Sequence, residues 1–323
     1  NTWFVRLARF GTLLALTVVM LGAWVRLTDA GLGCPDWPGC YGRLVVPDQA
    51  TPAEELGAEF NRPLEAAKAW REMIHRYLAS TLGLVCLALA AIAWRNRKDP
   101  TQPWRTPLAL VALVIFQGLL GMWTVTLLLK PIVVVGHLFG GLATLSLLFS
   151  LGRWRSVSVV SQSAGLRLLG LTAVAALVLQ IFLGGWTSAN YAALACPDLP
   201  TCQTQWWPSI ADFDEAFVLW RGIGIDYEGG VLDHPARVAV HFTHRLGALL
   251  ATFLVALLGW RLALQAATRP DGLAVLALLL TQVSLGVSIV WFGVPLAVAV
   301  LHNGVAALLL LSVVNANQRI RQA

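Results

Sequence analysis

The stretch TPLALVALVIFQGLLGMWTVTLLL at positions 106–129 contains no charged residue and decides the fold class. A helix rises about 1.5 Å per residue, so this stretch is long enough to cross a bilayer core of about 30 Å. In lipid, a helix satisfies the backbone polar groups of such a segment internally. Seven more apolar stretches, with few or no charges, lie at 9–28, 72–94, 132–152, 165–187, 236–260, 271–292 and 296–315. The sequence therefore predicts an all-α polytopic membrane protein with eight transmembrane helices.

The composition agrees with a lipid-embedded chain. Hydrophobic residues make up 57% of it and charged residues 12%, and the mean hydropathy is +0.69. These values exclude an ordinary soluble domain. The first apolar stretch runs into a long polar loop without a small-residue cleavage site, so we expect a retained helix rather than a signal peptide. No nucleic-acid-binding motif accompanies the net charge of +6, which we interpret as a signal of membrane topology.

Charged residues predict the orientation of the helices. The loops at 29–71 and 188–235 hold fourteen of the seventeen acidic residues, whereas Lys and Arg concentrate in the short loops and at the C-terminal end. Basic loops stay in the cytoplasm. We therefore predict a multi-pass protein of the bacterial inner membrane, with both termini cytoplasmic and both long loops periplasmic. Lys130, between two helices, is expected to be an interfacial anchor.

Four of the five cysteines lie in the two long loops. Cys34 and Cys40 occur in the first loop, and Cys196 and Cys202 in the second. An oxidising periplasm favours disulfides between cysteines at this spacing. We interpret both pairs as structural links within the loops, and a redox-active role is the alternative. Cys86, inside a predicted helix, is expected to be a small packing residue.

The chain contains an internal duplication. Residues 9–152 and 165–315 carry the same motifs in the same order. Each half contains four predicted helices, so the two halves have the same orientation in the membrane. We predict two tandem pseudo-symmetric four-helix bundles, over 1–155 and 156–323. A Gln-x-x-Leu-Gly pattern on the third, fifth and seventh helices indicates close helix packing. The matched motifs are LGAW at 21–24 and LGGW at 183–186, CPDWPGC at 34–40 and CPDLPTC at 196–202, EMIHR at 72–76 and HFTHR at 241–245, and QGLLG at 117–121 and QVSLG at 282–286.

Histidines cluster at one depth of the predicted bilayer. Five of the six lie near the outer end of an even-numbered helix, where an ionisable side chain is costly and commonly functional. The first half pairs His75 with His137, and the second pairs His244 with His302. Two imidazoles of one bundle can bind the iron of a planar macrocycle from opposite faces, which predicts haem. Zinc, the rival metal, prefers three or four protein ligands. A hydrogen bond between helices is the alternative for any single histidine.

Each half places an arginine directly after a histidine. Arg76 and Arg245 are candidates for binding haem propionates, with snorkelling to the interface as the alternative. One turn earlier the halves differ, because Glu72 in the first half stands where His241 stands in the second. A partly buried carboxylate beside a haem can move protons, so Glu72 is the candidate catalytic residue. A structural role at a helix start is its alternative. His241 is an alternative ligand, and His234 is predicted to begin a helix.

These motifs resemble the haem A synthase family over nearly the whole chain. The resemblance rests on the duplicated eight helices, the Glu72-x-x-His75-Arg76 motif, His137, the second histidine pair and the two cysteine loops. It implies that the first half binds the substrate haem O through His75 and His137, and that the second half holds haem b through His244 and His302. It also implies that Glu72 is required while the C8 methyl group of haem O is oxidised to a formyl group. The product would be haem A for terminal oxidases.

The same residues also allow two alternative functions. The main alternative is a dihaem b-type membrane protein that transfers electrons without porphyrin chemistry, and Glu72 is the feature that separates the two. A periplasmic thiol oxidoreductase is a second alternative, based on the loop cysteines. Two imidazoles leave iron no open position, so either a histidine dissociates or oxidation occurs at the ring edge. Candidate partners are haem O synthase, assembly factors of terminal oxidases and a second copy of the chain.

Overall fold

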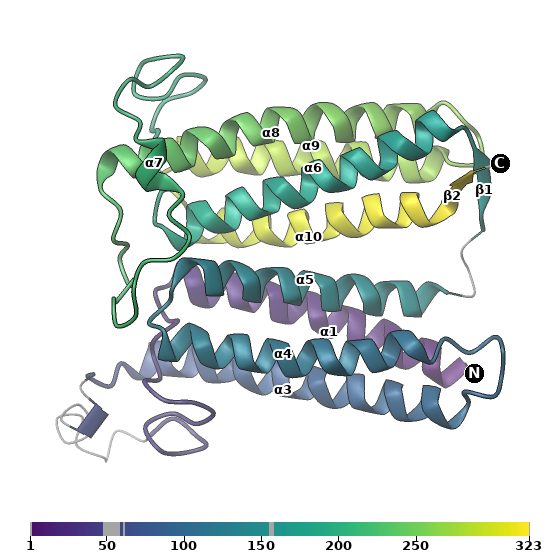
Figure 1. Ribbon diagram of the computed structural model, residues 1–323, viewed down its shortest axis with the longest axis horizontal. Coiled ribbons are helices and arrows are strands. Elements are labelled where there is room, and N and C mark those ends of the chain that lie inside the picture. Colours follow the sequence, from purple (N-terminus) through teal and green to yellow (C-terminus); the bar gives the residue numbers. More distant parts are fainter. Residues whose placement is uncertain (1, 48–58, 61, 155–157, 323) are drawn as a thin grey trace. The chain divides into compact units, whose positions relative to one another are not determined.

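The computed structural model describes residues 2–47, 59–60, 62–154 and 158–322 (Figure 1). Within these residues eight helices are long and apolar enough to cross a membrane, which confirms the predicted polytopic fold. A short helix, α7 (Phe213–Ala216), and two parallel three-residue strands, β1 (Val160–Gln162) and β2 (Ile320–Gln322), complete the regular elements there. The long helices are α1 (Thr2–Leu27), α3 (Ala66–Arg95), α4 (Arg105–Thr126), α5 (Pro131–Arg153), α6 (Ala164–Ala189), α8 (His234–Ala263), α9 (Arg269–Trp291) and α10 (Leu296–Arg319).

Several helices extend beyond their apolar stretches. Helix α3 begins at Ala66 rather than at 72, and α8 begins at His234, as predicted for that histidine. Asp233 caps α8, because its carboxylate accepts a hydrogen bond from the Ala236 amide at 3.0 Å. Pro235 suits the first turn, where its missing N–H has no helical partner to lose. The first turns of both helices contact the long loops, because Gly33 packs against the backbone of Lys68 and the Asp212 amide donates to the Pro235 carbonyl.

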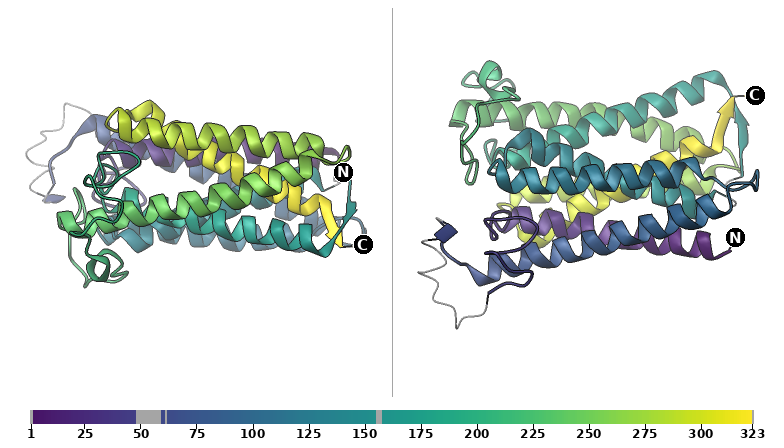
Figure 2. Two further views of the ribbon diagram at one scale, coloured as in Figure 1. Left: turned by 90° about the horizontal axis from the view of Figure 1, so that it is seen from above. Right: turned by 60° about the horizontal axis from the view of Figure 1, so that its bottom comes forward.

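The chain divides into two compact units, and each contains four of the long helices (Figures 1 and 2). Unit 1 comprises residues 1–152 and 219–231, with α1, α3, α4 and α5. Unit 2 comprises residues 153–218 and 232–323, with α6, α8, α9 and α10. In unit 2, α8 packs against α6 and α9, and α10 packs against α9 and α6. In unit 1, α3 packs against α1 and α4, while Arg9 of α1 donates to the Gly152 carbonyl of α5 at 3.1 Å.

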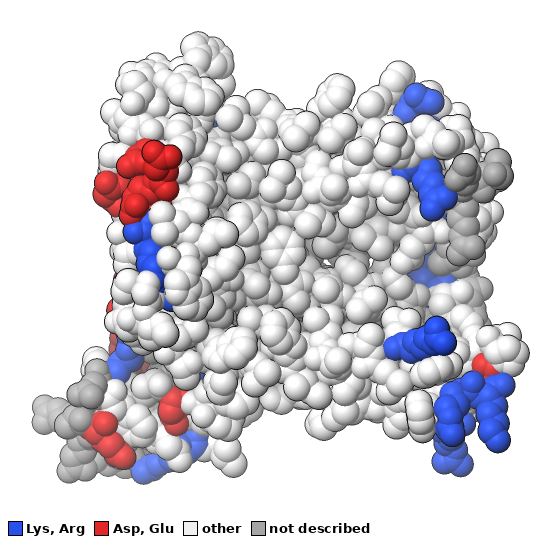
Figure 3. Space-filling view, viewed as in Figure 1, with Lys and Arg blue, Asp and Glu red and all other residues white. Residues whose placement is uncertain are grey.

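Charged side chains separate along the helices of each unit. On the face drawn in Figure 3, Asp and Glu gather mainly at the ends that carry the long loops, together with some Lys and Arg, and the larger groups of Lys and Arg lie at the opposite ends. The space-filling surface between the two ends is nearly free of charge on the face drawn. A surface of this kind is suited to lipid, which supports a multi-pass membrane protein.

Lys130, at the turn between α4 and α5, is not the interfacial anchor that we expected. Its side chain is buried, with 2% of the residue exposed. The ammonium lies 3.4 Å from the ring centroid of Trp220 and donates a hydrogen bond to the Gly222 carbonyl. The expectation is wrong because residues 219–231, which come from the second long loop, pack in unit 1 and cover this turn.

Candidate functional site

The structure brings His75 of α3 and His137 of α5 together inside unit 1. Their ring centroids are 6.5 Å apart, and the ring planes meet at 73°. Imidazole nitrogens lie about 2 Å from a metal that they bind, so two rings on opposite sides of one iron would have centroids roughly 6 Å apart. In the described part of the chain, Nδ1 of each ring is buried without a hydrogen-bond partner. Both observations fit a pair of ligands to one haem iron.

Unit 2 contains a second histidine pair on the corresponding helices. His244 lies on α8 and His302 on α10, two helices that both pack against α6 and α9. Nδ1 of His302 is buried without a partner among the described residues. Those residues also contain no group of three or more His, Cys, Asp or Glu side chains that could hold a metal ion. Each unit therefore offers two imidazoles, and two ligands suit a macrocyclic iron better than tetrahedral zinc.

All four imidazoles pack against a glycine of the preceding long helix. A Cβ atom added to any of these glycines would lie close to Cε1 of the histidine ring. The absence of a glycine side chain therefore lets the ring pack this close to the helix. We expected three of these glycines, those of the Gln-x-x-Leu-Gly pattern, to be helix-packing residues, and the contacts of all four with the rings were not predicted. The four contacts are Gly22 with His75 at 3.1 Å, Gly121 with His137 at 3.5 Å, Gly184 with His244 at 3.2 Å, and Gly286 with His302 at 3.1 Å.

Three of these histidines also contact a glutamine that sequence analysis did not include in the site. Each glutamine precedes its glycine by four residues, and its Oε1 is buried without a partner among the described residues. An amide in this position can orient an imidazole, as polar neighbours of metal ligands commonly do. The shared Gln-x-x-Leu-Gly spacing was the available signal. Nε2 of Gln117 donates to the His137 carbonyl at 2.9 Å, Nε2 of Gln180 lies 3.0 Å from Nδ1 of His244, and Nε2 of Gln282 lies 3.1 Å from Nε2 of His302.

Glu72 lies one turn before His75, and only 5% of the residue is exposed. Its Oε2 accepts a hydrogen bond from the Cys34 amide at 2.9 Å, and its Oε1 pairs with Arg76. In unit 2, His241 makes the matching contact, because the Cys196 amide donates to its Nδ1 at 3.2 Å. Both loops are therefore fixed to a helix in the same way. The group at the contact is a carboxylate in unit 1 and an imidazole in unit 2.

The two cysteine loops close around the arginines that follow the histidines. Cys34 is bonded to Cys40 and Cys196 to Cys202, and all four residues are at most 1% exposed. Arg76 donates to the carbonyls of Asp36 and Gly39 at 3.0 and 2.5 Å, and Arg245 donates to those of Asp198, Thr201 and Cys196 at 2.7, 2.7 and 2.5 Å. The arginines therefore hold the loops in place. Contact of either guanidinium with a haem propionate stays a prediction.

Comparison with known proteins gives consistent matches over nearly the full length. Residues 5–314 match the model of the COX15-CtaA family, described as "Cytochrome oxidase assembly protein". A "Heme A synthase" of Shewanella oneidensis is 46% identical over 98% of this chain and 95% of that protein. Proteins of the same name are 30% identical in Novosphingobium aromaticivorans, over 92% of this chain and 89% of that protein, and in Halalkalibacterium halodurans, over 93% and 92%.

Proposed function

Because this chain belongs to the cytochrome oxidase assembly protein family COX15-CtaA, we propose that it oxidises the C8 methyl group of haem O to the formyl group of haem A. The chain is a membrane-bound oxidoreductase of haem A biosynthesis. Conversion of a methyl to a formyl group adds one oxygen atom at the level of water and releases four electrons and four protons, so it needs an electron acceptor from outside the chain. Two hydroxylations of one methyl carbon give a geminal diol, which loses water to leave the formyl group. The observation that supports this reaction best is a buried carboxylate one turn from a pair of imidazoles in unit 1.

We assign the substrate to unit 1 and haem b to unit 2. His75 and His137 would hold haem O by its iron, which fixes the ring in the bundle, and Glu72 would hold or move a proton beside it. His244 and His302 would hold haem b, which supplies one-electron transfer when bound. The difference between Glu72 and His241 supports this assignment, since the carboxylate occurs in unit 1 alone at this position.

We also propose that the long loops face the periplasm of a bacterial inner membrane. Acidic residues are concentrated in these loops and basic residues at the opposite helix ends, as the positive-inside rule requires. Disulfides in both loops are suited to an oxidising compartment. Their burial argues against the thiol oxidoreductase alternative, because exchange needs an accessible sulfur.

The composition of the bound pigments tests the proposed function. Protein purified from cells that supply haem O should contain haem B together with haem O or haem A, because the two histidine pairs would hold different haems. Liquid chromatography of the extracted pigments measures this composition. Haem B alone in both sites would favour the dihaem electron-transfer alternative, and a colourless protein would exclude both functions.

Gly184→Val should lower the affinity of unit 2 for haem b by about tenfold or more, because side chains forced into packed space cost about 1–3 kcal/mol. The valine would press against Cε1 of His244, which already lies 3.2 Å from the position of an added Cβ. The measurement is haem B per protein after purification. Gly83→Val is the matched control, since nothing lies within 4 Å of a Cβ added there. Equal haem loss in both variants would mean that valine acts through the helix backbone instead.

A further inference from the structure

Residues Leu219–Val231, here called the strap, pack within unit 1 although the residues before and after them belong to unit 2. Tyr227 is the buried centre of the strap and is 3% exposed. It packs with Leu32, Val125 and Leu129, and its amide donates to the Leu128 carbonyl at 3.0 Å. The strap therefore contacts both the turn between α4 and α5 and the start of the first long loop.

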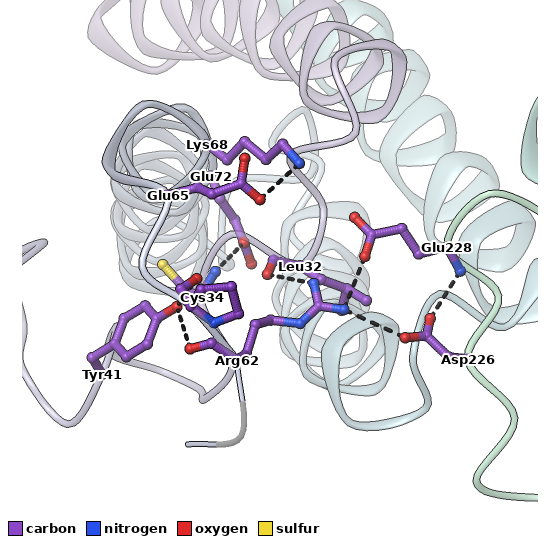
Figure 4. Close-up of polar contacts among 10 residues, drawn as sticks. Leu32, Cys34, Tyr41, Arg62, Glu65, Lys68, Glu72, Asp226 and Glu228 are labelled. Carbon is purple, nitrogen blue, oxygen red and sulfur yellow. Dashed lines mark hydrogen bonds and ion pairs between the residues drawn. The ribbon is translucent and has the colours of Figure 1, made fainter. Parts of the chain in front are cut away.

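Two cations of unit 1 hold the strap on either side of Tyr227. Lys130 binds the Gly222 carbonyl and stacks its ammonium on Trp220, an interaction of about 2 kcal/mol when the cation is desolvated. Arg62 holds the other side through its Nη2, which lies 2.9 Å from Glu228 and 3.4 Å from Asp226 (Figure 4). The side chain of Arg62 is 24% exposed, so this ion pair is partly shielded from water.

The same guanidinium is bonded to the loop that holds Glu72. Nη1 of Arg62 donates to the Leu32 carbonyl at 3.0 Å, as Figure 4 shows. Charge-assisted hydrogen bonds of this kind are stronger than neutral ones. Arg62 therefore joins the two carboxylates of the strap to the backbone at Leu32.

The backbone from Leu32 to Cys34 leads directly to Glu72. Gly33 lies against the backbone of α3, because an added Cβ would be 2.6 Å from the Lys68 carbonyl carbon. The next amide, that of Cys34, donates to Oε2 of Glu72 at 2.9 Å. Three consecutive residues thus connect the guanidinium of Arg62 with the carboxylate of Glu72. A shift of Leu32 would move the N–H that holds this carboxylate.

We propose that Arg62 is a positioning residue, through which the strap fixes the Leu32–Cys34 backbone and so the carboxylate of Glu72. The strap is part of the second long loop, so the geometry of Glu72 depends on a segment that the second half of the chain supplies. This inference rests on the proposed role of Glu72 in haem A formation. The proposal gives Arg62 no role in binding haem.

The test compares full-length variants in membranes supplied with haem O. Arg62→Gln removes the guanidinium, and the double variant Asp226→Asn/Glu228→Gln releases the strap while Arg62 stays. Each should lower the rate of haem A formation about tenfold, the loss expected when a hydrogen bond to a charged group is removed. Arg62→Lys should recover part of the rate, because one ammonium cannot reach Leu32 and both carboxylates together. Pigment content should stay at the wild-type value in all of them.

Hydrogen–deuterium exchange supplies the readout that is independent of turnover. Uptake should rise in Arg62→Gln within peptides that cover residues 29–36 and 219–231, and stay unchanged in peptides of α8 and α10. Lys68→Gln is the matched control, because it removes an exposed pair with Glu65, 2.9 Å long, in the same region. It should change neither rate nor uptake.

Two results would overturn the inference. One is a wild-type rate in both Arg62→Gln and Asp226→Asn/Glu228→Gln, and the other is unchanged uptake at residues 29–36. Failure of the proposed function looks different, since membranes with the wild-type protein would then form no haem A from haem O. In that case, raised uptake at residues 29–36 in Arg62→Gln would still support the link from the strap to the Cys34 amide.

Discussion

Glu72→Gln should lower the rate of haem A formation by about a hundredfold or more, the usual contribution of a general acid or base. Glutamine has nearly the same shape, and its Oε1 can still accept the hydrogen bond from the Cys34 amide. It cannot exchange a proton with a substrate. We therefore expect the pigment content of the purified protein to be unchanged while haem O accumulates in place of haem A. Chromatography of membrane pigments measures both quantities.

Glu65→Gln is the matched control for this prediction. Glu65 directly precedes α3 and forms an exposed ion pair with Lys68, so it carries the same charge outside the bundle. We expect a wild-type rate, since exposed ion pairs of this kind contribute little. A wild-type rate in Glu72→Gln would make Glu72 a structural carboxylate that holds the first cysteine loop. It would also mean that a group other than Glu72 moves the proton, because haem A would still form.

His137→Ala should abolish binding of the substrate haem and leave haem b in place. The replacement removes one of two imidazoles in unit 1 and leaves His244 and His302 of unit 2 untouched. His302→Ala should give the reverse result, with loss of haem B from the purified protein and retention of haem O. Because each variant is the control for the other, general unfolding of the bundles is distinguished from loss of one ligand. Parallel loss of both haems in either variant would contradict separate sites.

The membrane fold could be predicted from sequence because lipid allows few structures. Long apolar stretches with few charges must become helices in lipid, and the eight long helices follow the eight stretches. Their ends could not be placed from apolar length alone. Ala66 begins α3 without a side-chain cap, and His234 begins α8 after the Asp233 cap, both in polar sequence where hydropathy does not mark the boundary.

The residues of the candidate site that could be predicted from sequence are those of a type seldom found inside a membrane helix. A histidine or glutamate inside a membrane helix is unusual enough to be noticed, and the structure places His75 beside His137. Contacts between residues that are distant in the chain could not be predicted in this way, because the residues involved are of ordinary types for a loop. Arg62 with Glu228 and Lys130 with Trp220 join ordinary loop residues whose pairing depends on the path of the second long loop. The roles of the four histidines stay predictions.

Electron paramagnetic resonance of the oxidised protein tests the central claim most directly, because it reports the axial ligands of each iron. If His75 with His137 and His244 with His302 each bind one iron from both faces, the wild-type protein should give two low-spin ferric haem signals. His137→Ala should then remove the low-spin signal of unit 1 and leave that of unit 2. A wild-type spectrum dominated by high-spin iron, or two low-spin signals that persist in His137→Ala, would contradict the account.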